Sequence, residues 1–127
     1  MKIARTINHS DEVTQEIYEN GGIKWYKNGL LHKEDGPAVE WDGNYKSWYK
    51  EGKLHREDGH ALQYPNGRKI WFKNGKKHCE IGPAVEDRNG NKEYWINDKQ
   101  ISEKEFNALQ LNKELSINSK LNKKIKI

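Results

Sequence analysis

Short apolar runs alternate with polar, glycine-containing turns along most of the chain, and one pattern recurs at a fixed interval. It reads WYKNGLLHKEDGPAVE from Trp25, WYKEGKLHREDGHALQ from Trp48 and WFKNGKKHCEIGPAVE from Trp71. A period of about 20–50 residues indicates stacked supersecondary units, none of which buries its apolar face alone. A spacing of 23 or 24 residues relates Trp25, Trp48, Trp71 and Trp95; His32, His55 and His78; Gly36, Gly59 and Gly82; and Ala38, Ala61 and Ala84.

Two sets of turn signals divide each unit into strands. The first set is Asn28-Gly29, Glu51-Gly52 and Asn74-Gly75, and the second is Asp42-Gly43, Asn66-Gly67 and Asn89-Gly90. Such dipeptides favour two-residue hairpin turns, because both central residues take positive φ. The runs between them, such as KSWYK and RKIWFK, predict strands, and Pro37 and Pro83 interrupt the pairing. We therefore predict a mainly β fold, an antiparallel β-hairpin repeat ribbon or solenoid with units of about 23 residues.

The periodicity changes after Gln100. Ser102, followed three residues later by Glu105, is a capping-box signature. We predict a short C-terminal capping α-helix from about Glu103 to Leu115, within a segment 103–118, that covers the open edge of the last hairpin. The other predicted divisions are an N-terminal segment 1–13 without a defined element, β-hairpin repeats over 14–102 and a mobile basic tail over 119–127.

Composition narrows the classes of function. Only 33% of the residues are hydrophobic, but there are 5 Trp and 6 Tyr, so we expect a thin core built from these rings. The net charge of +4 comes from the segment from Lys99 to Ile127, which leaves the repeats neutral and weakens the case for nucleic-acid binding. The single cysteine, Cys79, excludes an internal disulfide, and no apolar run is long enough to cross a membrane. A reducing, cytoplasmic location is the expectation.

The repeated pattern resembles the MORN-type repeat family. It is more similar to a MORN-like variant found in bacterial, bacteriophage and giant-virus proteins, W-Y-x-N-G-x-x-H-R-x-D-G-P-A, which WYKEGKLHREDGHA (48–61) follows nearly throughout, with His60 in place of Pro. The glycine lies four residues after each histidine, unlike in ordinary MORN units, so a phospholipid ligand is not carried over. The resemblance implies a binding or scaffolding role and supplies no catalytic residues.

The repeated histidines are the candidates for chemistry. If each unit adds two strands, neighbouring copies lie about 10 Å apart at ~4.8 Å per strand. Zinc–nitrogen distances are ~2.1 Å, so adjacent copies cannot share an ion. Cys79 follows His78 but points to the opposite face of a strand. We interpret the histidines as structural, satisfying turn carbonyls or stacking on Trp, and predict no catalytic site, no metal, no cofactor and no enzymatic activity.

Two aromatic rows alternate along the strands, and they suggest a contact surface. The Trp row and the Tyr/Phe row cannot share one face, so one row forms the core and the other is partly exposed, unless both pack in a curled sheet. An exposed row flanked by lysines predicts a protein-docking strip. The predicted partner-binding residues are Tyr26, Tyr49, Phe72, Lys27, Lys50 and Lys73.

The predicted function is a non-enzymatic protein-binding repeat module. By analogy it is an inhibitor or accessory factor, of phage or bacterial origin, that blocks a partner such as a defence nuclease or toxin. The alternative is binding of RNA or single-stranded DNA, with bases stacked on the aromatic rows and phosphates bound by the basic tail. That alternative uses Lys120, Lys123, Lys124 and Lys126. No membrane partner is predicted, and the exposed ribbon edges allow a dimer.

Overall fold

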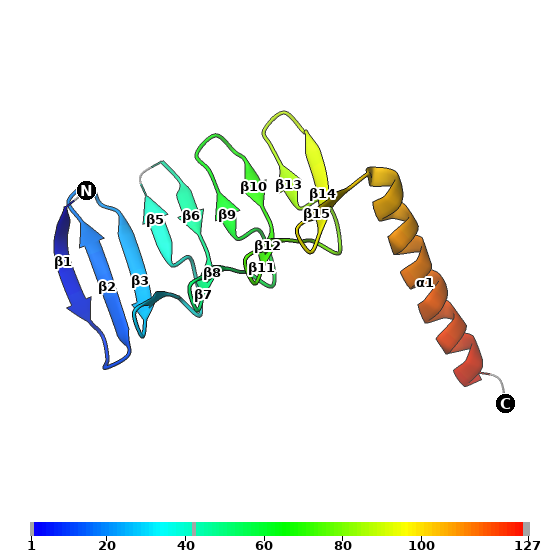
Figure 1. Cartoon of the computed structure of the whole chain (residues 1–127), viewed down its shortest axis with the longest axis horizontal. Coiled ribbons are helices and arrows are strands. Elements are labelled where there is room, and N and C mark those ends of the chain that lie inside the picture. Colours follow the sequence, from blue (N-terminus) through cyan, green and yellow to red (C-terminus); the bar gives the residue numbers. More distant parts are fainter. Residues whose placement is uncertain (1, 42, 126–127) are drawn as a thin grey trace.

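The computed structural model describes residues 2–41 and 43–125 and confirms the predicted fold class. In this part of the chain, antiparallel strands form a row of hairpins, and one helix projects from the C-terminal end (Figure 1). The elements are β1 (Ile3–Asn8), β2 (Val13–Tyr18), β3 (Ile23–Lys27), β4 (Leu30–Leu31), β5 (Val39–Trp41), β6 (Tyr45–Ser47), β7 (Tyr49–Lys50), β8 (Lys53–Leu54), β9 (Leu62–Gln63), β10 (Lys69–Ile70), β11 (Phe72–Lys73), β12 (Lys76–Lys77), β13 (Val85–Glu86), β14 (Lys92–Ile96), β15 (Lys99–Ile101) and α1 (Glu103–Ile125).

Each unit contributes one long hairpin and one short hairpin. The long hairpins β2–β3, β5–β6, β9–β10 and β13–β14 stand side by side in the main sheet, where β3 pairs with β5, β6 with β9 and β10 with β13. The short hairpins β3–β4, β7–β8, β11–β12 and β14–β15 form a second row beside it (Figure 1). The repeat therefore builds a two-rowed stack, in which each unit pairs mainly with its neighbours.

A tryptophan marks the point where the chain passes from the long to the short hairpin. The backbone N–H of Trp48 donates to the Ala61 carbonyl of the next long hairpin (2.7 Å), and the Trp48 carbonyl accepts from His55 N–H (3.0 Å). Trp25 and Trp71 make the same two bonds with their own neighbours. The strand bends here because its two edges pair with different hairpins on either side of the Trp.

Trp95 does not belong to this row, although the sequence predicted that it does. Its carbonyl accepts from Cys79 N–H (3.1 Å), just as the Phe72 carbonyl accepts from Arg56 N–H (3.2 Å). Trp95 therefore stands in the Tyr/Phe row, and Tyr94, 23 residues after Trp71, takes the Trp position. The spacing of 24 before Trp95 was the signal of this one-residue shift.

The first set of turns has the predicted conformation, but in the second set Asn66-Gly67 and Asn89-Gly90 do not. Asn74 and Gly75 both have positive φ, 50° and 80°, as a two-residue hairpin turn requires. In the long hairpin, Gly67 alone of its pair has positive φ (91°), and Tyr64 N–H donates to the Arg68 carbonyl across a three-residue loop. The loop is a turn followed by a glycine in the left-handed conformation. The loop that contains Gly90 has the same conformation. Asp42 lies outside the described residues.

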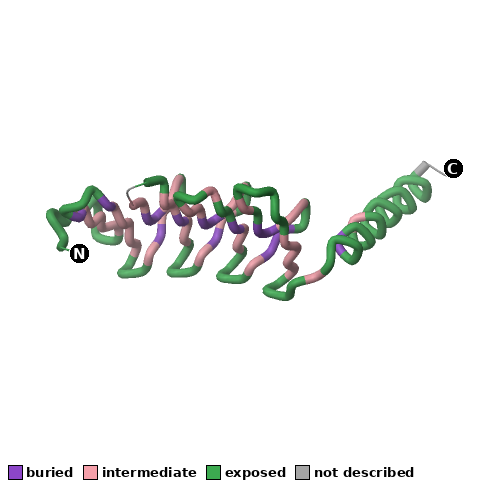
Figure 2. The backbone as a smooth tube through the Cα atoms, turned by 90° about the horizontal axis from the view of Figure 1, so that it is seen from above, coloured by how far each residue is buried: buried purple, intermediate pink, exposed green. Residues whose placement is uncertain are grey.

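The core is aliphatic, so the expected core of Trp and Tyr rings is wrong. Its centre is formed by Leu62, Ile70 and Val85, with Tyr45, Tyr64, Phe72 and Trp95 packed around it half-buried. The alanines that follow the loops, Ala38, Ala61 and Ala84, are fully buried. Both aromatic rows are half-buried, so neither row alone forms the core and neither is fully exposed. The buried positions run as a narrow band along the stack (Figure 2).

Two terminal segments differ from the prediction. Residues 3–8, expected to lack a defined element, form β1, which pairs with β2. The side chains of β1 are mostly exposed, so its sequence lacks the apolar pattern that would have predicted a strand. The helix starts at the predicted capping box, where Glu105 N–H donates to Ser102 Oγ (3.0 Å), but it continues through 119–125, which were predicted to be tail. It contacts β14 through its first turns and then extends away from the sheet (Figure 2). Most of the last edge is therefore left uncovered.

Candidate functional site

The repeated histidines are built into the junctions between units. Nδ1 of His32, His55 and His78 accepts the backbone N–H of Glu51, Asn74 and Asn97, respectively, at 2.9–3.0 Å. The acceptor role of Nδ1 places the ring proton on Nε2. Each ring therefore satisfies a turn amide of the following unit, not a turn carbonyl as predicted.

The second nitrogen of each ring holds an acidic side chain in place. Nε2 of His32 lies 2.7 Å from Glu34 Oε1, that of His55 lies 2.8 Å from Glu57 Oε1, and that of His78 lies 3.3 Å from Glu80 Oε1. The hydrogen bond from His32 lowers the pKa of Glu34 from its ordinary value. Because both ring nitrogens are engaged, the histidines position carboxylates and do not present a free base to solvent.

The resulting surface carries basic and acidic side chains in alternation. We call it the charged face and define it by Lys27, Glu34, Lys50, Glu57, Lys73 and Glu80. The Glu34 and Glu57 side chains are 75% and 72% exposed although each is fixed by a buried histidine. Lys27 pairs with Glu34 at 3.8 Å, whereas Lys50 and Lys73 form no ion pair with any residue that the structure describes.

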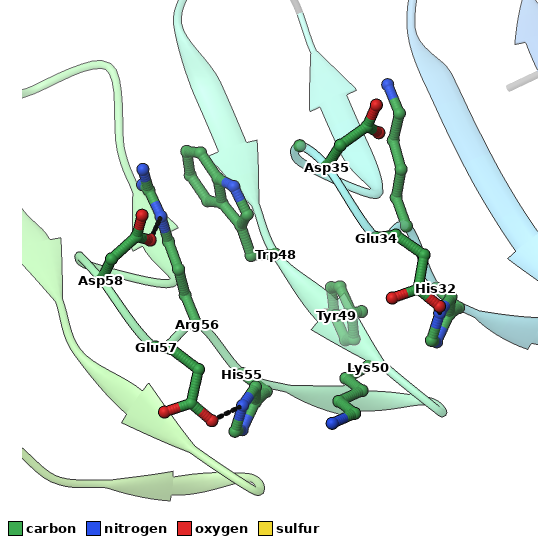
Figure 3. A pocket seen from close by; sticks show the side chains of 12 residues that line it. His32, Glu34, Asp35, Trp48, Tyr49, Lys50, His55, Arg56, Glu57 and Asp58 are labelled. Atoms are coloured by element: carbon green, nitrogen blue, oxygen red, sulfur yellow. Dashed lines mark hydrogen bonds and ion pairs between the residues drawn. The ribbon is translucent and has the colours of Figure 1, made fainter.

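A hollow of about 470 Å³ lies on this face between the first two loops. Its walls are 33–36 and 55–58, and its floor is Trp48, Tyr49 and Lys50 (Figure 3). The carboxylates of Asp35 and Asp58 stand at the rims, and Arg56 Nε donates to Asp58 Oδ1 at 3.2 Å. This hollow combines an aromatic floor with charges of both signs, and its Trp, Tyr and Arg are residue types enriched in protein interfaces.

The third unit has a different loop and a smaller hollow of about 190 Å³. Cys79 takes the place of Lys33 and Arg56, and Ile81 takes the place of Asp35 and Asp58. Cys79 is 3% exposed, whereas Ile81 is 80% exposed at the tip of its loop. Burial raises the pKa of the Cys79 thiol, and hydrogen bonds from the backbone of Ile81 and Gly82 oppose this.

The six predicted partner-binding residues are not equally available. Lys50 and Lys73 are exposed on the short hairpins, and Tyr49 and Phe72 are half-buried beside them. Tyr26 is half-buried and hydrogen-bonded to Glu16, and this burial and hydrogen bond raise the pKa of its hydroxyl. The predicted strip is therefore most accessible in its second and third copies.

The predicted nucleic-acid-binding lysines lie on the far end of the helix. Lys120, Lys123 and Lys124 are exposed on the last turns of α1, and Lys126 lies outside the described residues. Lys113, two turns earlier, pairs with Glu80 of the charged face at 3.8 Å. The helix thus joins the charged face through Lys113, at the end of the stack where Ile96 stands in the position of Lys73.

Sequence reasoning missed the role of the glutamates. Glu34, Glu57 and Glu80 each follow a repeated histidine by two residues, and this spacing was the available signal. Residues two apart on an extended chain point to the same side, so each His–Glu pair could have been predicted.

The charged face is the candidate functional site of a hairpin-repeat protein. Comparison of the chain with family models, with curated proteins and with solved structures yields no match. No group of three or more His, Cys, Asp or Glu side chains within 2–41 and 43–125 is placed to hold a metal ion. No described helix is both long and apolar enough to cross a bilayer.

Proposed function

We propose that the chain is a MORN-like repeat protein that acts as a non-enzymatic protein-binding module through its charged face. The observation that carries the proposal is the fixation of exposed carboxylates by buried histidines, repeated in consecutive units. A side chain that is already ordered loses little conformational freedom on binding, so preorganised charges favour affinity and specificity.

The partner we propose is a protein with a surface of alternating charge and exposed aromatic or arginine side chains. Lys50 and Lys73 are its first contacts, because they are exposed and without an ion pair among the described residues. A bacterial defence nuclease or toxin, blocked by this chain as an inhibitor, is the kind of partner that the MORN-like resemblance and the size of the chain suggest. The buried single thiol of Cys79 fits a reducing compartment, and we propose the cytoplasm.

The test compares partner capture by charge-reversed variants. The tagged full chain is used to isolate bacterial proteins, and the complex is weighed by native mass spectrometry. Lys50→Glu with Lys73→Glu is expected to abolish capture of a stoichiometric partner. The matched control, Lys69→Glu with Lys92→Glu, changes two exposed lysines on the long hairpins and should retain it. Equal capture by both double variants, or no stoichiometric partner for the wild type, would contradict the proposal.

Nucleic-acid binding is a second candidate because three exposed lysines gather on the last turns of α1. Binding that depends on these residues falls with rising salt, since each phosphate contact releases counterions. Deleting 119–127 should then remove retention on single-stranded RNA, while the Lys50 and Lys73 variants retain it. Retention that is unchanged by this deletion would exclude the candidate.

A further inference from the structure

Four equivalent rings form the row beside the loops: Trp25, Trp48, Trp71 and Tyr94. Three of them are covered by a group from the chain itself. Lys33 Nζ lies over Trp25 at 4.6 Å from the ring centroid, and the Arg56 guanidinium lies over Trp48 at 4.1 Å. Phe106 of the helix packs on Tyr94 with the ring centroids 4.8 Å apart. Among the described residues, no cation and no aromatic ring covers Trp71.

The reason for this difference lies in the third loop. The covering cation stands eight residues after its tryptophan in the first two units, and Cys79 occupies that position after Trp71. A cysteine side chain ends at Sγ and carries no cation, so it cannot cover the ring as Arg56 covers Trp48. The acid that binds Arg56, Asp58, is also replaced, since Ile81 stands at that place. The third unit has thus lost the cation and its counter-ion together.

The space left at Trp71 is a hollow suited to a cation. Its lining includes Trp71, Cys79 and Ile81 together with the exposed carboxylates of Glu57 and Glu80. Two cations also line it, and a third, Lys113 of the helix, pairs with Glu80 at 3.8 Å. Arg56 is stacked on Trp48 and bound to Asp58, and Lys73 is exposed on a flexible stem that can move into solvent.

We propose that the hollow at Trp71 binds an arginine side chain of the partner protein, which takes the place that Arg56 fills at Trp48. Trp is the strongest ring for a cation, and the planar guanidinium both stacks and hydrogen-bonds to carboxylates. The arginine stem would pack against Ile81, and its guanidinium would face Glu57 and Glu80. This inference rests on the proposed protein-binding function and names the chemistry of one contact.

The test uses the full chain labelled with nitrogen-15 and the capped tripeptide Gly-Arg-Gly as the probe. The indole N–H signals of the tryptophans are followed by NMR during the titration. The largest shift is expected at Trp71, and the same tripeptide with citrulline or methionine in place of arginine should shift it at least about fivefold less. Equal shifts with citrulline, or similar shifts at all indoles, would overturn the proposal.

Two variants make the result specific. Cys79→Arg supplies the chain's own cation and should suppress the Trp71 shift, whereas Arg56→Ala uncovers Trp48 and should make its indole respond to the arginine peptide. Unfolding temperatures identify a variant that fails to fold. The NMR response of either variant that folds is sufficient to test the arginine site. Failure of both responses, while capture still depends on Lys50 and Lys73, would refute the arginine site and leave the protein-binding function intact.

Discussion

The imidazole of His55 is hydrogen-bonded to the backbone of Asn74 in the next unit, with 2.9 Å between Nδ1 and the amide nitrogen. The same ring is bound through Nε2 to Glu57, whose side chain is exposed on the charged face. One buried side chain therefore connects two units and orders a surface carboxylate. Stability and the proposed binding surface share this residue.

Replacing His55 with Ala should lower the free energy of unfolding by about 2 kcal/mol, because it leaves the Asn74 amide without its acceptor and opens a gap. Urea denaturation followed by tryptophan fluorescence measures this. The matched control is Glu57→Gln, which keeps the ring and changes an exposed carboxylate, and should cost less than about 1 kcal/mol. Similar losses in both variants would show that the inter-unit bond contributes little.

Glu51 occupies a turn position at which the first, third and fourth units have asparagine, and its φ is 49°. Asparagine tolerates this left-handed conformation better than glutamate does. Glu51→Asn should therefore raise the free energy of unfolding by about 0.5 kcal/mol, and the reciprocal change Asn74→Glu should lower it by a similar amount. Both variants keep the backbone N–H that binds histidine. A lower melting temperature for Glu51→Asn would contradict the expectation.

Gly22 lies against the indole of Trp41, where a Cβ would come within 1.9 Å of the ring. Gly22→Ala must displace Trp41, which packs on Tyr18 with centroids 5.2 Å apart, so we expect a loss of about 2 kcal/mol. Apart from its own residue and its two chain neighbours, Gly82 has no atom within 4 Å of its Cβ position, and Gly82→Ala should stay within about 0.5 kcal/mol of the wild type. Thermal unfolding of the two variants measures this difference. Equal melting temperatures would contradict the predicted clash between the added methyl group and Trp41.

Phe106 is the buried anchor of the helix, with 5% exposure, and Leu115 is an exposed leucine on the same helix. Phe106→Ala should lower the free energy of unfolding by about 3 kcal/mol, because it removes the ring that packs on Tyr94 and leaves a cavity. Leu115→Ala should change stability by less than about 0.5 kcal/mol. Hydrogen exchange of β14 and β15 should rise in the first variant alone. Protection that is unchanged by Phe106→Ala would mean that the helix does not stabilise the last hairpin.

Cys79 should react slowly with thiol reagents in the folded protein. Reaction requires the thiolate, and burial both raises the pKa of Cys79 and blocks access to the sulfur. We expect a rate at pH 8 at least about 100-fold below that of the chain in denaturant, rising with pH as the thiolate fraction grows. A native rate equal to the denatured rate would show that the third loop opens readily.

The repeat period and the turn residues were sufficient to predict the class of fold. A spacing of 23 residues places equivalent residues at equivalent positions in the stack. The sequence alone therefore predicts that Trp25, Trp48 and Trp71 occupy the same position in their units. The hairpin turn at Asn74-Gly75 and the helix start at the Ser102–Glu105 capping box were also predictable, because each depends only on residues close together in the sequence. These features follow from short-range backbone preferences.

Contacts between units were decided by the tertiary structure. No local rule says that the His55 ring meets the amide of Asn74, 19 residues away, or that Trp95 joins the row of Phe72. The aliphatic centre of the core was also decided there, because Leu62, Ile70 and Val85 come from strands of two neighbouring hairpins that only the fold brings together. The sequence by itself determined the hairpins and their order. Only three-dimensional packing decided that the residue eight positions after a tryptophan lies over its ring, because that contact depends on the path of the loop between them.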